Sequence, residues 1–546
     1  MKASSNALRW ILLAVIAISF AINYAGIFDP KMDTNGDNYQ YYQLAHSLAR
    51  GDGYVTDFEP VQTPHMHFPP GYPAFMALFL KIFPDNIVAL KILNGLLYLL
   101  SLILLFRIVR RSTGPAGIWI AFVSCLVCTF HPELLRWSTI LMSEMLYMAV
   151  SFGIIAICQD LDFEKLRRKD WRQILLLVLL CLLVASTYFI RTMGVAVVLA
   201  AALAFTVLAL RQLLKKQDKK SWVWPALTCL LVALSLFAAK TSWDIRNEHV
   251  IPGYKSDYLD TFVHKSASSD MMETFGDWTT RIGKNIKAFV SFYIPKSIFS
   301  TAKAVTTLPV PTVPVTALDW IGGILLILVM LAGLCSMKGL GVLTVSYVII
   351  NFGVLMLYQE QYAGVRYFIP VLPLLICALI AGTWAIVSYI AGRLGMKKAS
   401  WAAYAAIIVL ALVIIASSVK DQKIYRDYAA TKSYKELPEY NPVREYIQAC
   451  EYFKTAPEDF VVASRKPEIF YVHSGYHHSL MIPRSGTPEE VIQYLEDNHV
   501  DAVILDHWFR HAYMFVLPAI QKYPERFPLL VMFGQQEQPT AIFLFK

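Results

Sequence analysis

The chain has 546 residues, of which 56% are hydrophobic and 16% are charged. Soluble proteins carry about a quarter charged residues, so this composition excludes a string of ordinary soluble domains and predicts a polytopic membrane protein. The net charge of +9 does not indicate a nucleic-acid partner, because 19 of the 49 Lys and Arg lie in short stretches between apolar runs. Seven of the eight cysteines lie inside apolar runs, so we expect no disulfide framework and no zinc site.

The apolar runs predict eleven transmembrane helices, because each is close to the length of about 17 to 25 residues that crosses a bilayer. In chain order they lie at 8–28, 87–106, 116–131, 140–158, 173–190, 192–210, 222–240, 317–336, 340–357, 367–390 and 401–418.

The positive charges between these runs predict their orientation. The candidate inner segments hold 19 Lys and Arg, whereas the three short outer turns hold one each, Arg136, Arg191 and Arg366. Because inner loops carry the excess of positive charge, we expect the N-terminus inside and the C-terminus outside. Lys2 and Arg9 precede the first run, which we interpret as a retained anchor. Loops at 29–86 and 241–316 and the tail at 419–546 would then be exported.

The tail predicts a second domain, so the chain divides into a transmembrane domain at 1–418 and an extracytoplasmic α/β domain at 419–546. Asn441-Pro442 opens a helix to about residue 455, and Thr487 with Glu490 forms a capping box for another to about 498. Strands are expected at 460–463, 502–505, 529–533 and 541–545, with a helical pattern at 510–523. No phosphate-binding loop is recognisable there, so we expect a docking or covering role. The single cysteine of this domain fits the cytoplasmic membrane of a bacterium.

The first exported loop holds a carboxylate in a position suited to chemistry. Residues 37–50 predict an amphipathic helix on the membrane surface, with Asp37 in its first turn. The helix dipole favours an ionised carboxylate there, which can accept a proton from a hydroxyl. The alternative is that Asp37 only caps the helix.

The same loop continues with His65, His67 and a turn of three prolines and one glycine that contains Tyr72. Such a turn is rigid and would form a preset wall of a substrate site. The two histidines could bind a divalent metal with Asp33 or Asp37, donate to a phosphate, or be solvated. Two histidines without a third ligand at fixed spacing are a weak metal signal, so no metal ligand is assigned.

Ionisable residues near the predicted spans gather at the outer ends, at Lys91, Glu144, Arg191, Lys240 and Asp319. A transporter that couples to protons would place such groups near the middle of the bilayer. The observed placement instead predicts a pocket for a substrate with a lipid tail in the bilayer and a polar head at the surface.

Four motifs resemble a known family. They are Asp37-x-Tyr39-x-x-Tyr42-x-x-Ala45-x-x-Leu48-x-x-Gly51, His131-Pro132-Glu133 with Ser143-Glu144, Ile190-Arg191-Thr192-Met193-Gly194, and the run from Val365 to Pro373. In this order, and all at the outer side, they resemble the GT-C superfamily of membrane glycosyltransferases. The most similar branch contains protein O-mannosyltransferases and the aminoarabinose transferases of lipid A.

This resemblance implies that residues 1–418 form the catalytic domain of an inverting glycosyltransferase. The sugar donor would be a polyprenyl-phosphate or diphosphate lipid, and the acceptor a lipid, a glycan or a protein at the outer face. Membrane lipids are the other expected partners, and no cofactor is expected apart from a divalent metal near Asp37, His65 and His67, which stays open. Many members carry a closer acidic pair, whereas Asp33 and Asp37 are four residues apart, so either could be the base.

The resemblance and the chemistry together suggest roles for the charged residues. Asp37 is the expected base, and Arg366 and Arg191 are the expected phosphate ligands, since a guanidinium can grip phosphate oxygens in a bidentate way. Glu144 would pair with Arg191 or position the acceptor. The alternative for Arg366 is a pair with Glu360 at the membrane edge.

The second exported loop predicts a basic amphipathic helix at 281–295, which would anchor at the interface or attract an anionic lipid.

Two other functions fit the same composition. An O-antigen ligase or polymerase also has many spans, but its chemistry would depend on Arg and His of a later loop. A transporter of lipid-linked glycans is the third candidate, and the lack of charges at mid-membrane and of an internal repeat counts against it.

Overall fold

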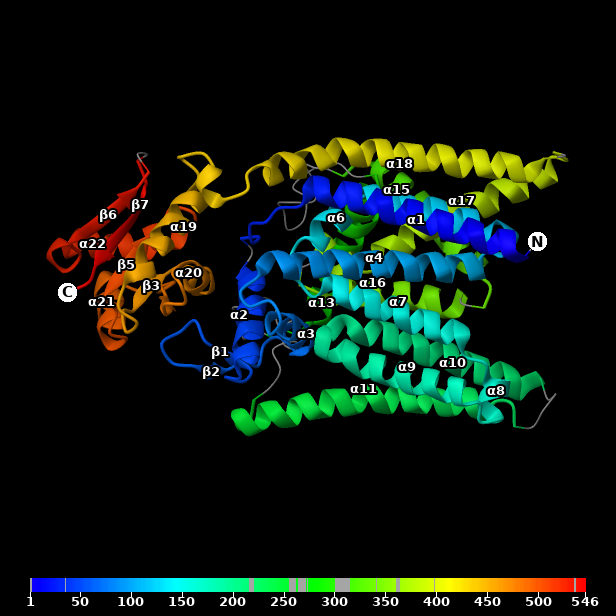
Figure 1. The fold of residues 1–546 in the computed structure, drawn as a ribbon, viewed down its shortest axis with the longest axis horizontal. Helices are drawn as coiled ribbons and strands as arrows, with labels where there is room; N and C mark the ends of the chain where they lie inside the picture. The colour runs from blue at the N-terminus through cyan, green and yellow to red at the C-terminus, as the bar shows by residue number, and fades with distance from the viewer. Residues whose placement is uncertain are drawn as a thin grey trace.

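A computed structural model of the chain describes residues 2–34, 36–215, 220–254, 262–263, 272, 274–299, 315–339, 341–359, 364–396, 398–534 and 537–546. Long helices run side by side in one bundle, and a smaller domain with a β-sheet lies at one end of it (Figure 1). The N-terminus lies at the opposite end of the bundle from this domain. This is the predicted fold class, a helical membrane domain followed by an α/β domain.

Each of the eleven predicted spans falls on a helix. The helices are α1 (Lys2–Ile27), α4 (Ile87–Ser112), α5 (Gly117–Phe130), α7 (Glu144–Asp160), α9 (Trp171–Ile190), α10 (Val195–Lys215), α11 (Val223–Val250), α15 (Ala317–Ser336), α16 (Gly341–Leu357), α17 (Leu372–Arg393) and α18 (Ala399–Ala430).

Length and composition give a smaller number of spans than eleven. Within the described ranges, eight helices are long and apolar enough to cross a membrane. A ninth span results if α5 and α6 (Pro132–Ser138), which meet at 68°, are counted as one broken span. The remaining two predicted spans correspond to α7 and α16, which have 17 residues each.

Proline explains the break between α5 and α6. The residue before a proline avoids the helical region, and His131, which precedes Pro132, has an extended backbone with ψ of 118°. Its side chain then caps α6 by accepting from the Leu134 N–H. The chain therefore turns sharply at the predicted outer end of α5.

Glycines let α15 and α17 approach closely. A Cβ on Gly333 would lie 1.8 Å from the carbonyl oxygen of Ala378, and one on Gly382 would lie 2.0 Å from that of Val329. Such contacts between small residues stabilise helix pairs in membranes, where the hydrophobic effect between helices is weak.

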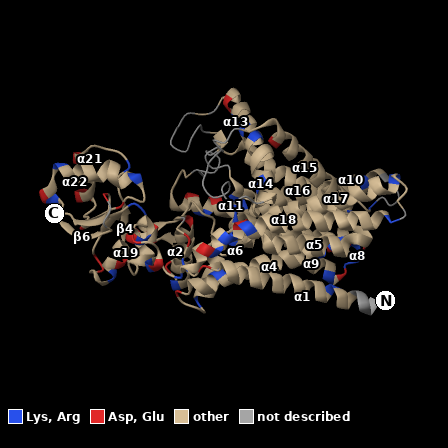
Figure 2. Cartoon of the chain, turned by 90° about the horizontal axis from the view of Figure 1, so that it is seen from above, with Lys and Arg blue, Asp and Glu red and all other residues tan. Residues whose placement is uncertain are grey.

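Charged residues avoid the middle of the bundle. Figure 2 shows Lys, Arg, Asp and Glu at its two ends and on the small domain, with nearly uncharged helices between. The basic helix α8 (Phe163–Arg167) lies at the end that carries the N-terminus, as predicted for an inner segment (Figure 1).

The first loop forms a compact layer between the bundle and the small domain (Figure 1). It comprises α2 (Gly36–Arg50), the short strands β1 (Val55–Thr56) and β2 (Thr63–Pro64), and α3 (Gly71–Leu80). The helix at 37–50 is confirmed, but its expected place on the membrane surface is wrong. Tyr39 is fully buried, and its hydroxyl contacts Tyr434 at 3.1 Å and His473 at 2.9 Å. Tyr41, on the face that was expected to lie on lipid, is buried as well, and its ring packs on Phe68 at 4.7 Å and on Tyr72 at 5.3 Å. The tail therefore covers one side of this helix, and the rest of the first loop covers the other.

The second loop is described only in part. It contains α13 (Phe275–Ala288), a π-helical segment at Phe289–Tyr293 and α14 (Ile294–Ile298). The basic helix predicted at 281–295 is therefore present, within a helical run that extends from Phe275 to Ile298. Asn285 is buried and donates to backbone carbonyls at the end of α16, so this helix packs on the bundle.

The small domain contains a five-stranded mixed sheet with strand order β4-β3-β5-β7-β6. β3 (Val462–Ser464) pairs in parallel with β4 (Ser479–Met481) and β5 (Ala502–Leu505), and β7 (Thr540–Leu544) is antiparallel to β5 and β6 (Leu529–Phe533). Its helices are α19 (Pro442–Tyr452), α20 (Pro467–His473), α21 (Pro488–Asp497) and α22 (Leu517–Lys522).

All four predicted strands and the capping box at Thr487 are present. The sequence did not predict β4 or α20, which have three and seven residues. The division expected at residue 418 falls inside α18, which continues to Ala430.

Candidate functional site

Asp37, Arg366, Glu144 and Arg191 form one connected group of ion pairs. Arg366 donates from Nη1 to Asp37 Oδ2 and from Nε to Glu144 Oε1, both at 2.8 Å. Arg191 Nη1 contacts the same Glu144 oxygen at 2.7 Å and donates to Ser143 Oγ at 3.2 Å. Two acids and two bases, predicted separately from the sequence, are thus brought together.

Glu144 lies at the centre of this group. Its side chain is fully buried, whereas that of Asp37 is 34% exposed. A buried carboxylate needs compensation, and two guanidinium groups supply it here. We therefore regard Glu144 as the residue that fixes the positions of both arginines, and Asp37 as the acid that remains accessible.

Local structure explains why these side chains converge. Asp37 lies in the first turn of α2, and Glu144 begins α7. Arg191 occupies the break between α9 and a short 3₁₀ turn at Thr192–Gly194, and Arg366 lies in a 3₁₀ turn at Val365–Phe368. Each is at a helix end, so its charge reaches the site without crossing the interior of the bundle.

Aromatic rings line the arginines. The guanidinium carbon of Arg366 is 5.8 Å from the ring centres of Trp137 and Tyr367, and that of Arg191 is 5.4 Å from the ring of Tyr367. Such contacts favour a cation and restrict its rotamers. Among the described residues, the Nη2 of Arg366 contacts the Met142 sulfur at 3.9 Å, a weak acceptor, so this nitrogen can donate to a ligand.

Gly71 fixes the wall of the site next to Arg191. A Cβ at Gly71 would lie 2.7 Å from the Phe189 carbonyl carbon and oxygen and 2.8 Å from the Ile190 nitrogen. Only glycine allows the start of α3 to approach the end of α9 this closely.

Asp33 belongs to a different group. Its carboxylate is 3.7 Å from Arg136 of α6, and no ion pair between the described residues joins it to Arg366. The two acids of the first loop therefore face different cations.

His65 has both ring nitrogens engaged. Nε2 accepts from the Phe68 N–H at 2.9 Å, and Nδ1 lies 3.0 Å from Thr56 Oγ1. Burial, and to a lesser extent the charges of His67 and Arg246, lower the pKa of His65 to about 3, so the ring is neutral at pH 7. A metal would have to break one of these bonds. Within the described part of the chain, no three His, Cys, Asp or Glu side chains are placed to hold a metal ion.

Tyr72 is fully buried, and its hydroxyl donates to Asn94 Oδ1 at 3.2 Å. Its ring meets that of Tyr41 edge-on at 5.3 Å. Tyr72 thus packs against α2 through Tyr41. Its expected contact with substrate stays a prediction.

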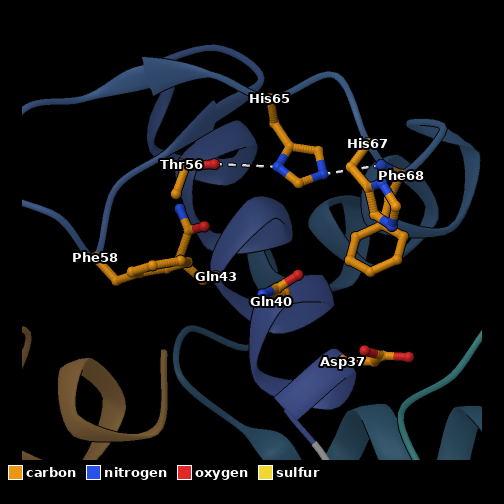
Figure 3. A pocket seen from close by; sticks show the side chains of 8 residues that line it. All are labelled: Asp37, Gln40, Gln43, Thr56, Phe58, His65, His67 and Phe68. Atoms are coloured by element: carbon orange, nitrogen blue, oxygen red, sulfur yellow. Dashed lines mark hydrogen bonds between the residues drawn. The ribbon is translucent and has the colours of Figure 1, made fainter. Parts of the chain in front are cut away.

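A cavity of about 400 Å³ opens on the other side of Asp37 (Figure 3). Three lining residues come from α2 and the others from the segment around β1 and β2: Asp37, Gln40, Gln43, Thr56, Phe58, His65, His67 and Phe68. Asp37 therefore lies between the arginines and a cavity.

Comparison with known proteins connects this geometry to a fold. A family model described as dolichyl-phosphate-mannose-protein mannosyltransferase matches residues 67–243, about a third of the chain. A search of curated proteins gives no significant match.

Solved structures match over almost the whole chain. ArnT of Cupriavidus metallidurans in the apo state has a TM-score of 0.57 at 9% identity, with 99% of this chain and 98% of that chain covered. The same protein bound to undecaprenyl phosphate has a TM-score of 0.54 at 10% identity, with 98% and 97% covered. The oligosaccharyltransferase AglB of Archaeoglobus fulgidus, in complex with an inhibitory peptide and dolichol-phosphate, has a TM-score of 0.57 at 12% identity, with 99% and 74% covered.

The chain has the GT-C fold. The resemblance stated from the four motifs is confirmed, and the chain is a multi-pass membrane protein of this type. At this level of identity the solved GT-C structures show the arrangement of the chain and not its substrates.

The sequence did not reveal every residue of this site. Trp137 and Tyr367, which line the arginines, and Gln40 and Gln43, which line the cavity, were not predicted. An aromatic residue next to Arg366 was a usable signal. The glutamines lie one turn apart on the helix of Asp37, and only the position of the β1–β2 segment shows that they face a cavity.

Proposed function

We propose that the chain is an inverting glycosyltransferase that moves a sugar from a polyprenyl-phosphate carrier to a hydroxyl acceptor at the outer face of a bacterial cytoplasmic membrane. The observation that supports it is the bond between Asp37 and Arg366. A base for the acceptor and a cation for the leaving phosphate lie 2.8 Å apart at the end of an uncharged helix bundle.

The chemistry follows from the charges that develop. The acceptor oxygen attacks the anomeric carbon of the sugar and its proton passes to Asp37, while the bond from that carbon to the phosphate oxygen breaks. The new glycosidic bond forms on the opposite face, and the carrier leaves as a phosphate anion. Arg366 and Arg191 stabilise this anion, because fixed cations at the place where negative charge grows lower the barrier.

Glu144 makes the arrangement possible before substrate binds. Arg366 and Arg191 both contact the same Glu144 oxygen. Without this carboxylate the two guanidinium groups would repel each other at short range. When a phosphate arrives, Arg366 can donate from Nη2 and exchange part of its contact with Asp37. This exchange would release the Asp37 carboxylate to the acceptor.

The similarity to two proteins solved with undecaprenyl phosphate and dolichol-phosphate supports a polyprenyl carrier. The layer of α2, α3 and the tail would receive the carrier phosphate at one end of the bundle. In this proposal the positive charge beside the leaving phosphate comes from Arg366 and Arg191, and no step is routed through a metal.

Mass spectrometry of glycolipids and glycoproteins tests the proposal in cells. Cells with the gene should contain a glycosylated product that cells without it lack, and the Asp37→Asn variant should fail to restore that product at equal protein level. The absence of any difference in glycosylation between the first two strains would overturn the proposal.

A further inference from the structure

The cavity beside Asp37 contains a buried acceptor that has no partner. Gln43 is 1% exposed, and its Nε2 donates to Ser47 Oγ at 2.8 Å and to the Val55 carbonyl at 3.0 Å. Because the Val55 carbonyl can only accept a hydrogen bond, the side-chain nitrogen of Gln43, and not its oxygen, must face it. Gln43 Oε1 is left buried without a hydrogen bond among the described residues. A buried acceptor without a donor is costly, which indicates that a ligand donates to it.

The tautomer of His65 frees a donor in the same cavity. The Phe68 N–H donates to Nε2, so the ring proton must be on Nδ1, which donates to Thr56 Oγ1 (Figure 3). Thr56 therefore uses its oxygen as an acceptor, and its hydroxyl proton can point into the cavity. The cavity thus offers an acceptor at Gln43 and a donor at Thr56.

The charge of the cavity excludes an anionic ligand. Asp37 is the only Asp, Glu, Lys or Arg among the eight lining residues, and the His65 ring is neutral at pH 7. A phosphate or carboxylate would meet a carboxylate without a cation inside the cavity. The lining therefore suits a ligand without negative charge, with hydroxyl groups for Gln43 and Thr56 and apolar faces for Phe58 and Phe68.

We infer that this cavity binds the acceptor of the proposed reaction, and that this acceptor is an uncharged saccharide. Its volume of about 400 Å³ lies within the range of about 300 to 1,000 Å³ that is usual for small-molecule sites. A peptide acceptor is less suited, because peptides are commonly bound through main-chain hydrogen bonds along a strand edge, whereas the polar groups here are side chains.

This inference rests on the proposed function but is tested without turnover. Saturation-transfer NMR would be recorded on the purified full-length protein with methyl α-mannoside, methyl β-galactoside and methyl N-acetyl-β-glucosaminide as probes. At least one glycoside should bind the wild type, and Gln43→Met and Gln40→Met should each weaken it about five- to tenfold, as expected for loss of one hydrogen bond. Gln521→Met, an exposed glutamine on α22, is the matched control and should bind as the wild type does. Gln40→Met decides the matter if Gln43→Met does not fold.

Two further binding measurements test whether the cavity holds the donor sugar instead of the acceptor, and whether the acceptor is a peptide instead of a saccharide. Undecaprenyl phosphomannose should not displace the glycoside, and displacement would assign the cavity to the donor sugar instead. A neutral threonine-containing peptide should not bind, and binding that depends on Gln40 would overturn the saccharide. Failure of every glycoside to bind would also overturn the inference. The transferase proposal would stand in that case if Asp37→Asn still abolished the cellular product.

Discussion

Arg366 is the residue that joins the two acids of the site. It donates to Asp37 and Glu144 through different nitrogens, and 329 residues separate it from Asp37 in the sequence. The expected alternative was a pair with Glu360, which lies outside the described residues. The buried Glu144 therefore holds Arg366 in place. The contact of Arg366 with the more exposed Asp37 can be exchanged for one with a ligand.

Loss of one guanidinium should therefore slow transfer. A charge-assisted contact to phosphate is worth about 1.5 to 3 kcal/mol, so Arg366→Ala and Arg191→Ala should each reduce turnover roughly ten- to a hundredfold. Arg366→Lys should recover part of the activity, since it keeps the charge and loses the fork. Turnover and carrier binding would be measured on purified, monodisperse protein. Unchanged values in all three variants would show that these arginines only stabilise the fold.

Asp506 of the small domain offers a test by pH. It is fully buried, with Oδ2 unpaired among the described residues, and burial raises the pKa of this carboxyl from 3.8 to about 7. Between these values the folded protein holds a proton that the unfolded protein has lost, so the domain loses stability as pH rises from about 4 to 7. Above pH 7 the folding free energy of the domain carries the whole of this loss. At about 1.4 kcal/mol per pKa unit, the loss is at most about 4 kcal/mol.

Asp506→Asn should therefore protect the sheet at pH 8 and change little at pH 4, because an amide never ionises. Hydrogen exchange of the β5 amides in the full-length protein measures this. The exposed Asp459→Asn is the control and should have no effect at either pH. A variant that is less protected than the wild type at pH 8 would contradict the account.

At the scale of elements, the hydrophobic pattern predicted where helices lie but not what covers them. All eleven apolar runs are helices, since each run is long enough to carry its own signal. The burial of α2 could not be predicted, because Tyr434, His473 and Tyr476 reach it from the tail about 400 residues later. Likewise, the sequence placed Asp37, Glu144, Arg191 and Arg366 at the outer side, whereas their pairing depends on how four helix ends meet.

The contact of α3 with α9 gives a prediction at this scale. Gly71→Ala would press a methyl group into the backbone at Phe189 and Ile190, which cannot move aside as a flexible side chain would. We expect a loss of about 1 to 3 kcal/mol, seen as a lower temperature of aggregation. Gly353→Ala in α16 is the matched control, since its added Cβ would meet nothing within 4 Å. Equal thermal stability of both variants would contradict the close packing.

At the scale of the whole molecule, the small domain and the first loop, as far as the structure describes them, lie at one end of the bundle. The small domain, α2 and α3 lie there, and the N-terminus and α8 lie at the other end (Figure 1). The positive charges of the short loops predicted this division, because their number alternates with each crossing. The same charges predict that the end with α8 faces the cytoplasm.

Reporter fusions test this orientation. A reporter that is active only outside the cytoplasm should be active after Lys546, and one that is active only in the cytoplasm should be active after Arg168 near α8. The reverse pattern at both positions would place the proposed site on the cytoplasmic side.

The most direct measurement of the central claim is the release of polyprenyl phosphate from a sugar-charged carrier by purified protein. Carrier and acceptor would be extracted from cells that lack the gene, and Asp37→Asn compared with Asp33→Asn. Loss of a general base typically costs about 10² to 10⁴ in rate, so Asp37→Asn should fall by at least about a hundredfold, whereas Asp33→Asn stays within about tenfold of the wild type. An active Asp37→Asn beside an inactive Asp33→Asn would contradict the account.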